Sequence, residues 1–195
     1  MKIKAAKISV IAIVLVLLFS VYACENNYYP KPRGYFRIDF PVKEYKDYSP
    51  ENCPFSFKIP SYATVASDTF GLVEPCWFDL VYPEFSAKVH LSYKELNNNF
   101  FKHAKDTEKL VYKHAAKADA IDPYIVTPNA DVTGMIYEIG GNAASSVQFF
   151  VSDSTNHFLR GALYFNCSPN EDSLAPVIQF IQKDIEALIA TTRWK

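Results

Sequence analysis

Residues 134–166, GMIYEIGGNAASSVQFFVSDSTNHFLRGALYFN, contain three apolar runs separated by two short polar connections. The runs are Gly134 to Ile139, Ser145 to Ser152 and Phe158 to Asn166, and each has the length of an ordinary strand. The connections, GGNAA and DSTN, are short enough to join neighbouring antiparallel strands. This stretch therefore predicts a three-stranded antiparallel meander.

A helical pattern lies on each side of the meander in the sequence. Before it, the stretch from about Glu95 to Ala118 has a stripe at three- and four-residue spacing, and the segment from Asp119 to Asn129 reads as a proline-punctuated crossing. After it, a helix is expected to be capped at Asp172 or Ser173, with Pro176 in its first turn. Its apolar face consists of Leu174, Val177, Ile178, Ile181, Ile185, Leu188 and Ile189.

Four further strands are predicted before the first helix: Phe36–Phe40, Phe55–Ile59, Trp77–Val81 and Ala87–Tyr93. The order of strands, helix, strands and helix predicts an α+β domain over residues 35–195, in which a single antiparallel sheet is packed by two long helices. This order resembles that of the Mog1/PsbP-like sandwich, a resemblance that concerns the fold and implies nothing about function.

The first 24 residues have the layout of a bacterial lipoprotein leader. Three lysines in MKIKAAK precede an apolar run that ends at Ala23, directly before Cys24. A transmembrane anchor is the alternative, but Ile8 to Ala23 is 16 residues, shorter than the ~20 that cross a bilayer. An ordinary secreted protein is a third interpretation. The sequence Val21–Cys24 resembles a lipobox, with Tyr22 in place of the usual small residue.

We therefore expect residues 1–23 to be a signal peptide that is removed, and Cys24 to receive a diacylglycerol with acyl chains such as palmitate. Residues 24–34 would then form a lipidated N-terminus and a proline-rich tether, because Pro30 and Pro32 disfavour helix. Two or three acyl chains make membrane attachment durable, whereas one chain is only marginal.

The mature chain would have 172 residues, with 17 basic and 21 acidic side chains, which argues against a nucleic-acid partner. Three cysteines remain besides Cys24, so at most one intramolecular disulfide forms. Cys53 and Cys76 are the preferred pair because each adjoins a proline and opens an apolar run, and Cys167 would stay free. Three buried free thiols remain the alternative. There is no C-x-x-C motif and no pair of nearby histidines, so no metal is expected.

Several polar residues are candidates for a functional role. His103 and His114 lie about 16 Å apart along a helix, too far for one metal ion, and like His90 they are interpreted as packing residues. Five lysines on the other side of the first helix form a possible interaction ridge for lipid phosphates, glycan phosphates or an acidic partner, although a solvated helix face is the simpler interpretation. They are Lys102, Lys105, Lys109, Lys113 and Lys117.

A hydrolase is the weakest candidate. Ser145 and Ser146 follow a glycine pair, and His157 lies downstream. However, the chain has no G-x-S-x-G, no Walker motif and no G-x-G-x-x-G. The residues alone thus predict no enzyme activity and no cofactor.

Long strings of the mature chain resemble the GldD-type gliding motility lipoproteins of Bacteroidota. They are YPKPRGYFRID (29–39), CPFSF (53–57), LVYKHAAKADAI (110–121), residues 140–166 and DSLAPVIQFIQKDI (172–185). The resemblance implies a non-enzymatic accessory of the gliding apparatus, tied to type IX secretion, with no cofactor. It assigns Cys24 to the lipidated position and Cys53 and Cys76 to two family cysteine positions, and it leaves Cys167 without one.

The implied partners are the membrane, through the lipid, and other envelope proteins of the gliding and secretion machinery. Glu25–Asn27 lacks the acidic run that resembles a surface-export signal, which favours the periplasmic face of the outer membrane. Two alternatives remain open. One is a periplasmic module that binds glycan or lipid through the Gly140–Ala144 loop and the lysine ridge, and the other is an envelope hydrolase that uses Ser146 and His157.

Overall fold

The computed structural model describes residues 37–67 and 74–195, so Cys24, the leader and the tether lie outside the described residues. The strands are β1 (Tyr45–Tyr48), β2 (Phe55–Pro60), β3 (Thr64–Ser67), β4 (Phe78–Tyr82), β5 (Ala87–Glu95), β6 (Ala118–Asn129), β7 (Val132–Gly141), β8 (Ser145–Ser152), β9 (His157–Phe165) and β10 (Arg193–Trp194). The helices are α2 (Phe100–Tyr112) and α3 (Glu171–Thr191), with short 3₁₀ turns η1 (Pro83–Phe85) and η2 (Lys113–Ala116).

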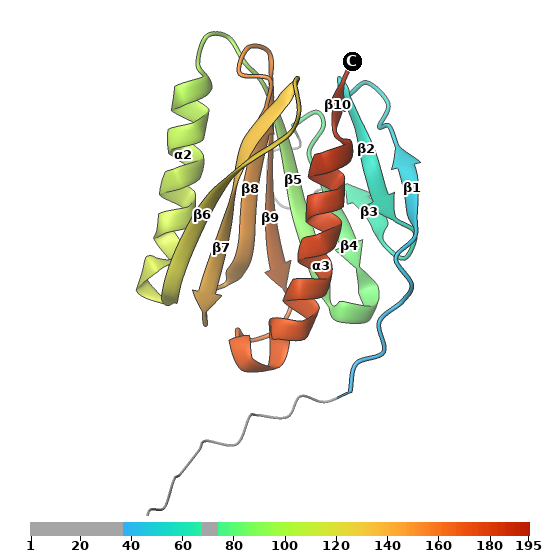
Figure 1. The fold of residues 1–195 in the computed structure, drawn as a ribbon, viewed down its shortest axis with the longest axis vertical. Helices are drawn as coiled ribbons and strands as arrows, with labels where there is room; N and C mark the ends of the chain where they lie inside the picture. Colours follow the sequence, from blue (N-terminus) through green and yellow to red (C-terminus); the bar gives the residue numbers. More distant parts are fainter. Residues whose placement is uncertain (1–36, 68–73) are drawn as a thin grey trace, which may run out of the picture. The chain divides into compact units, whose positions relative to one another are not determined.

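The predicted meander is confirmed, and it supplies three of the seven strands of a larger sheet. Strands β7, β8 and β9 pair antiparallel in sequence order. The seven-stranded sheet has the order β3-β4-β5-β9-β8-β7-β6, so β9 joins the meander to the earlier strands (Figure 1). In this arrangement β9 is a central strand with partners on both sides.

The prediction of a single sheet is wrong, because β1, β2 and β10 form a second, three-stranded sheet. The strand predicted at Phe55–Ile59 is present as β2, but its neighbours are β1 and the C-terminal strand β10. Alternation along β2 shows which side chains are buried, and it carries no information about which strand lies alongside. The second sheet therefore could not be separated from the first by sequence pattern.

The two helices pack on opposite faces of the seven-stranded sheet. Neighbouring residues Phe149 and Phe150 of β8 point to opposite faces, as in any strand. Phe149 belongs to the main core, which includes Ile181 and Ile185 of α3, whereas Phe150 belongs to a smaller core with Val111 of α2. Figure 1 shows α3 in front of the sheet, beside the strands of the second sheet.

The predicted apolar face of the last helix is largely confirmed. Five of its seven positions are buried, and the remaining two, Leu174 and Ile178, are half-buried. The helix starts earlier than expected, since Asn170 is the N-cap and its side-chain oxygen accepts a hydrogen bond from the Ser173 amide. Asn, Asp and Ser are equally good N-cap residues, so residue type alone could not show which of Asn170, Asp172 and Ser173 caps the helix.

The first helix is shorter than the predicted Glu95–Ala118. Strand β5 continues to Glu95, and three asparagines follow, of which Asn98 adopts a positive φ of 53°. Helix α2 begins only at Phe100, and a 3₁₀ turn replaces it after Tyr112. Asparagine tolerates the left-handed conformation. The turn that contains Asn98 therefore separates the end of β5 from the start of α2.

Two other segments also differ from the prediction. No strand covers residues 37–40, and the first strand of the described chain, β1, starts at Tyr45. Conversely, the crossing segment Asp119–Asn129 is strand β6, at the edge of the large sheet. Pro123 and Pro128 do not prevent this, because an edge strand can leave backbone positions without a ladder partner.

The turn between β8 and β9 yields a stability prediction. The Asp153 carboxylate accepts hydrogen bonds from the amides of Thr155, Asn156 and His157 at 3.0, 2.8 and 2.8 Å. Burial acts to raise the pKa of Asp153, but these three donors outweigh it and lower the pKa below its usual value. We expect Asp153→Ala to reduce the free energy of unfolding by about 1–2 kcal/mol at pH 7 in urea titrations.

The pH dependence of this variant provides a second test. Because the pKa of Asp153 is lower in the folded state, its contribution is complete above the unfolded pKa of about 3.9 and is lost as the pH falls through the folded value. Asp153→Asn should flatten the stability profile in that acidic range. The exposed Asp122→Asn is the matched control, and an equal flattening in it would contradict the assignment.

Candidate functional site

The buried carboxylate of Asp184 on α3 fixes the first described part of the chain. Asp184 is only 1% exposed. Its Oδ1 atom accepts from Lys43 Nζ at 2.6 Å and from the Tyr45 hydroxyl at 2.9 Å, and its Oδ2 atom accepts from the Tyr62 hydroxyl at 2.7 Å. We call these four residues the Asp184 network. Both oxygens of a buried charge are thus satisfied, as burial of a carboxylate requires.

Lys43 and Phe40 make further contacts to the same helix. The Lys43 ammonium donates to the Phe180 carbonyl at 2.7 Å and lies 3.5 Å from the centre of the Phe180 ring. Phe40 stacks on that ring at 4.5 Å. Burial lowers the pKa of Lys43, and the carboxylate of Asp184 opposes this shift. Residues 40–45, which follow the predicted tether closely in the sequence, are therefore attached to the C-terminal helix.

Sequence reasoning missed the Asp184 network, although one signal was available. Asp184 lies three residues after Ile181 and four before Leu188, within the apolar stripe of the last helix. An acid at such a position needs a buried partner. The partner itself was not identifiable, because Lys43 is 141 positions away.

A disulfide joins Cys53 to Cys76, with a Cα–Cα distance of 5.7 Å. Cys53 precedes β2 of the small sheet, and Cys76 precedes β4 of the large sheet. The bond therefore links the two sheets covalently. Cys167 is free and exposed.

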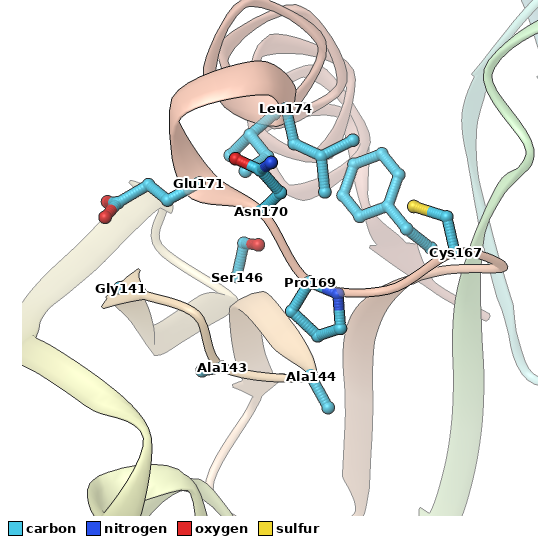
Figure 2. Close-up of a pocket in the computed structure, with 11 residues that line it drawn as sticks. Gly141, Ala143, Ala144, Ser146, Cys167, Pro169, Asn170, Glu171 and Leu174 are labelled. Atoms are coloured by element: carbon cyan, nitrogen blue, oxygen red, sulfur yellow. The ribbon is translucent and has the colours of Figure 1, made fainter.

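A small cavity lies beside the Gly140–Ala144 loop, between it and the start of α3 (Figure 2). Its lining includes Ala143, Ser146, Cys167 and Asn170. The volume of about 10 Å³ holds one water molecule and excludes a sugar ring. Glu171 borders the cavity, but its carboxylate points away from it in Figure 2. This geometry gives no support to glycan binding at the loop.

The five lysines of the predicted ridge are all exposed: Lys102, Lys105, Lys109, Lys113 and Lys117. They do not lie on one continuous α-helix, because α2 ends at Tyr112, Lys113 opens the 3₁₀ turn and Lys117 follows that turn. One of them, Lys109, is paired with Asp106 at 3.2 Å. The ridge is therefore shorter and less regular than an uninterrupted helix would make it.

Ser146 and His157, the candidate residues for a hydrolase, lie at opposite ends of two neighbouring strands. Ser145 pairs with Tyr164 across β8 and β9, and His157 lies seven residues before Tyr164. At about 3.3 Å per residue this separates Ser146 from His157 by more than 20 Å. His157 Nδ1 instead shares a hydrogen bond with the Tyr93 hydroxyl at 2.8 Å. The two residues therefore do not form a catalytic pair.

The other histidines contact aromatic rings. His103 packs against Phe158 with ring centres 5.6 Å apart, and His114 lies 6.5 Å from the ring of Tyr164. Burial lowers the pKa of both histidines. Over residues 37–67 and 74–195, no three His, Cys, Asp or Glu side chains come together as a metal site would require. In the same residues, no helix has the length and apolar content needed to cross a membrane.

Comparison with known proteins gives a family match and a structural neighbour. No curated protein matches the sequence. The solution structure of cyanobacterial PsbP (CyanoP) from Synechocystis sp. PCC 6803 superposes with a TM-score of 0.51 at 7% identity, covering 80% of this chain and 95% of that one. At this identity the likeness shows a shared fold, as the predicted PsbP-like order suggested. The family described as gliding motility lipoprotein GldD matches residues 25–194, and the chain therefore belongs to that family.

Proposed function

We propose that this protein is a non-enzymatic lipoprotein of the cell envelope that supports the gliding machinery and its linked type IX secretion system through protein contacts. The family match over residues 25–194 carries this proposal. The match begins directly after Cys24, the residue proposed to carry the lipid. The distance between Ser146 and His157 also supports a non-enzymatic role, because it argues against the catalytic pair that the sequence offered.

In this proposal the lipid at Cys24 and the contacts of the chain to α3 together connect the domain to the membrane. Cys24 holds the chain at the membrane, and the 13 residues from 24 to 36 span at most about 45 Å. From Phe40 onward, the chain is attached to α3 by the Asp184 network and the Phe40–Phe180 stack. In this proposal the lipid determines where the domain is placed, and the exposed surface of the domain contacts its neighbours at the periplasmic face of the outer membrane.

The test of the anchor is Cys24→Ala in a gliding host strain that lacks its own copy of the gene. We expect the variant to move from the membrane fraction to the soluble fraction and colony spreading to be lost, since durable attachment needs the acyl chains. Mass spectrometry of the wild-type protein should find a lipidated Cys24 at its N-terminus. Cys167→Ser, which changes an exposed free thiol, is the control and should keep both membrane association and spreading.

The proposal on partners is tested by crosslinking intact envelopes and isolating the protein with and without Cys24→Ala. Envelope proteins of the gliding and secretion machinery should be recovered with the wild type and reduced in the variant. Recovery of the same proteins at the same yield from the variant would show that the lipid does not direct assembly. Protease added to intact cells tests the orientation, since degradation of the domain without lysis would contradict a periplasmic location.

A further inference from the structure

One polar cluster on the α2 face of the large sheet has no role in the function proposed above. Phe158 of β9 packs in the small core with α2, so Arg160, Ala162 and Tyr164 point to the same face. The register places Gln148 of β8 and His90 of β5 on either side of Ala162. We call Gln148, Arg160, Tyr164 and His114 of η2 the Arg160 cluster.

The hydrogen bonding of Arg160 is incomplete. Its Nη2 atom donates to Gln148 Oε1 at 2.7 Å. This bond fixes the orientation of the amide, whose Nε2 atom is buried and has no acceptor in the part of the chain that the structure describes. The Nε atom of Arg160 is likewise buried without an acceptor among those residues. Gln148 is 0% exposed, so its amide does not face bulk solvent. Two buried donors are left over, which is unusual for a folded protein.

The charge of Arg160 is also unbalanced. In residues 37–67 and 74–195, no carboxylate forms an ion pair with it. Asp79, an acid on this face, already contacts Lys88 at 3.2 Å and His90. The charge of Arg160 contributes to lowering the pKa of His114, after burial. A largely enclosed guanidinium without a counter-charge is costly, and proteins normally pair such a group.

We propose that the Arg160 cluster binds a carboxylate group of a ligand or partner. The planar guanidinium presents its donors in a fork that fits a carboxylate, and one unpaired positive charge matches one negative charge. A phosphate monoester, with nearly two charges, would be only half neutralised. Arg160, Tyr164 and His114 are each partly exposed, so the cluster is reached from solvent while Gln148 closes its inner side.

The direct test is a titration of the purified full-length protein in detergent with acetate, at constant ionic strength maintained with chloride. The Arg160 Nε–H resonance, followed by NMR, should move and saturate with acetate. Acetamide has nearly the same shape and no charge, and it should cause no saturable change. Arg160→Gln should weaken acetate binding, measured on the Gln148 side-chain amide resonance, by at least about tenfold, the effect expected on loss of a charge-assisted pair.

The controls separate binding from folding and from general charge effects. Arg37→Gln removes an exposed arginine that pairs with Asp39 and should bind acetate as the wild type does. The Tm of Arg160→Gln should be unchanged or higher, because the substitution removes an unpaired charge. The proposal is overturned if acetamide acts like acetate, if Arg160→Gln binds acetate as tightly as the wild type, or if methyl phosphate binds more tightly than acetate.

The source of the carboxylate is tested with a second probe, a blocked dipeptide of alanine and glutamate, alongside its glutamine counterpart. Tighter binding of the glutamate peptide than of acetate would support an acidic side chain of a protein partner. Equal or weaker binding of the peptide would support a small carboxylate ligand. Either result is consistent with carboxylate binding at the Arg160 cluster, which the titrations with acetamide and methyl phosphate test. None of these titrations depends on the lipid anchor or on the role in gliding.

Discussion

Lys43→Met is expected to lower the free energy of unfolding by about 3–5 kcal/mol, which is the usual cost of leaving a buried charge without its partner. The substitution keeps the length of the side chain and removes the cation that contacts Asp184 Oδ1 at 2.6 Å. The carboxylate is 0% exposed and would keep only the hydroxyls of Tyr45 and Tyr62. Urea unfolding at pH 7 measures the loss.

A double-mutant cycle distinguishes the ion pair from simple packing. Lys43→Met combined with Asp184→Leu should be clearly more stable than Lys43→Met alone, because no buried charge remains. Lys46→Met, which changes an exposed lysine of β1, is the matched control and should change stability by less than about 0.5 kcal/mol. A loss in Lys43→Met no larger than in this control would show that the network does not hold the domain together.

The same substitution should release the N-terminal part of the domain locally. Strand β1 pairs with β2 over four residues, and Lys43, Phe40 and Tyr45 supply its contacts to α3. Without the ion pair, the amides of β1 should exchange with solvent faster than those of β8, which lies inside the large sheet. Equal acceleration in both strands would indicate global destabilisation in place of local release.

Removal of the Cys53–Cys76 disulfide is the second large effect. The bond closes a separation of 23 positions, for which the chain-entropy estimate is about 3 kcal/mol. The double substitution Cys53→Ala with Cys76→Ala should therefore lower the free energy of unfolding by about this amount. Because Cys53 and Cys76 precede strands of different sheets, we expect the small sheet to lose protection from hydrogen exchange first.

Reduction of the wild-type protein should reproduce the effect of the double substitution. A reductant is expected to destabilise the wild type by about 3 kcal/mol and to leave the double variant unchanged. Cys167→Ser is the control, since its thiol is exposed and unbonded, and its stability should equal that of the wild type. If the double variant unfolds at the same urea concentration as the wild type, the disulfide does not stabilise the fold.

Local patterns were sufficient for the parts of the fold that depend on neighbouring residues. The meander of β7, β8 and β9 followed from apolar runs and short connections. The face of α3 followed from its 3.6-residue period, which placed Val177, Ile181 and Ile185 in the core. The same reasoning failed where the chain partner is distant, as in β10, whose two residues pair with β2.

At the candidate sites, too, local features could be read from the sequence, whereas contacts with distant residues could not. The placement of Asp184 in an apolar stripe, and of Arg160 between the buried residues Phe158 and Ala162 of one strand, is visible in the sequence. What each charge contacts is not, because Lys43 lies 141 positions from Asp184 and only the packing of α3 brings them together. Likewise, that no carboxylate of residues 37–67 and 74–195 pairs with Arg160 depends on every element packed around it.

The amino-acid sequence alone determined the predicted lipid anchor, the α+β class and the buried faces of the long elements, because these depend on local composition and on short-range periodicity. The family resemblance also came from the sequence, but it depends on long strings of residues that resemble the family and not on periodicity. For residues 37–67 and 74–195, only the tertiary structure decided that the strands form two sheets, that Asp184 is paired, and that no carboxylate pairs with Arg160. Strand neighbours and charge partners are determined by contacts between residues far apart in the chain, and a periodic pattern specifies which side of an element is buried without specifying what covers it.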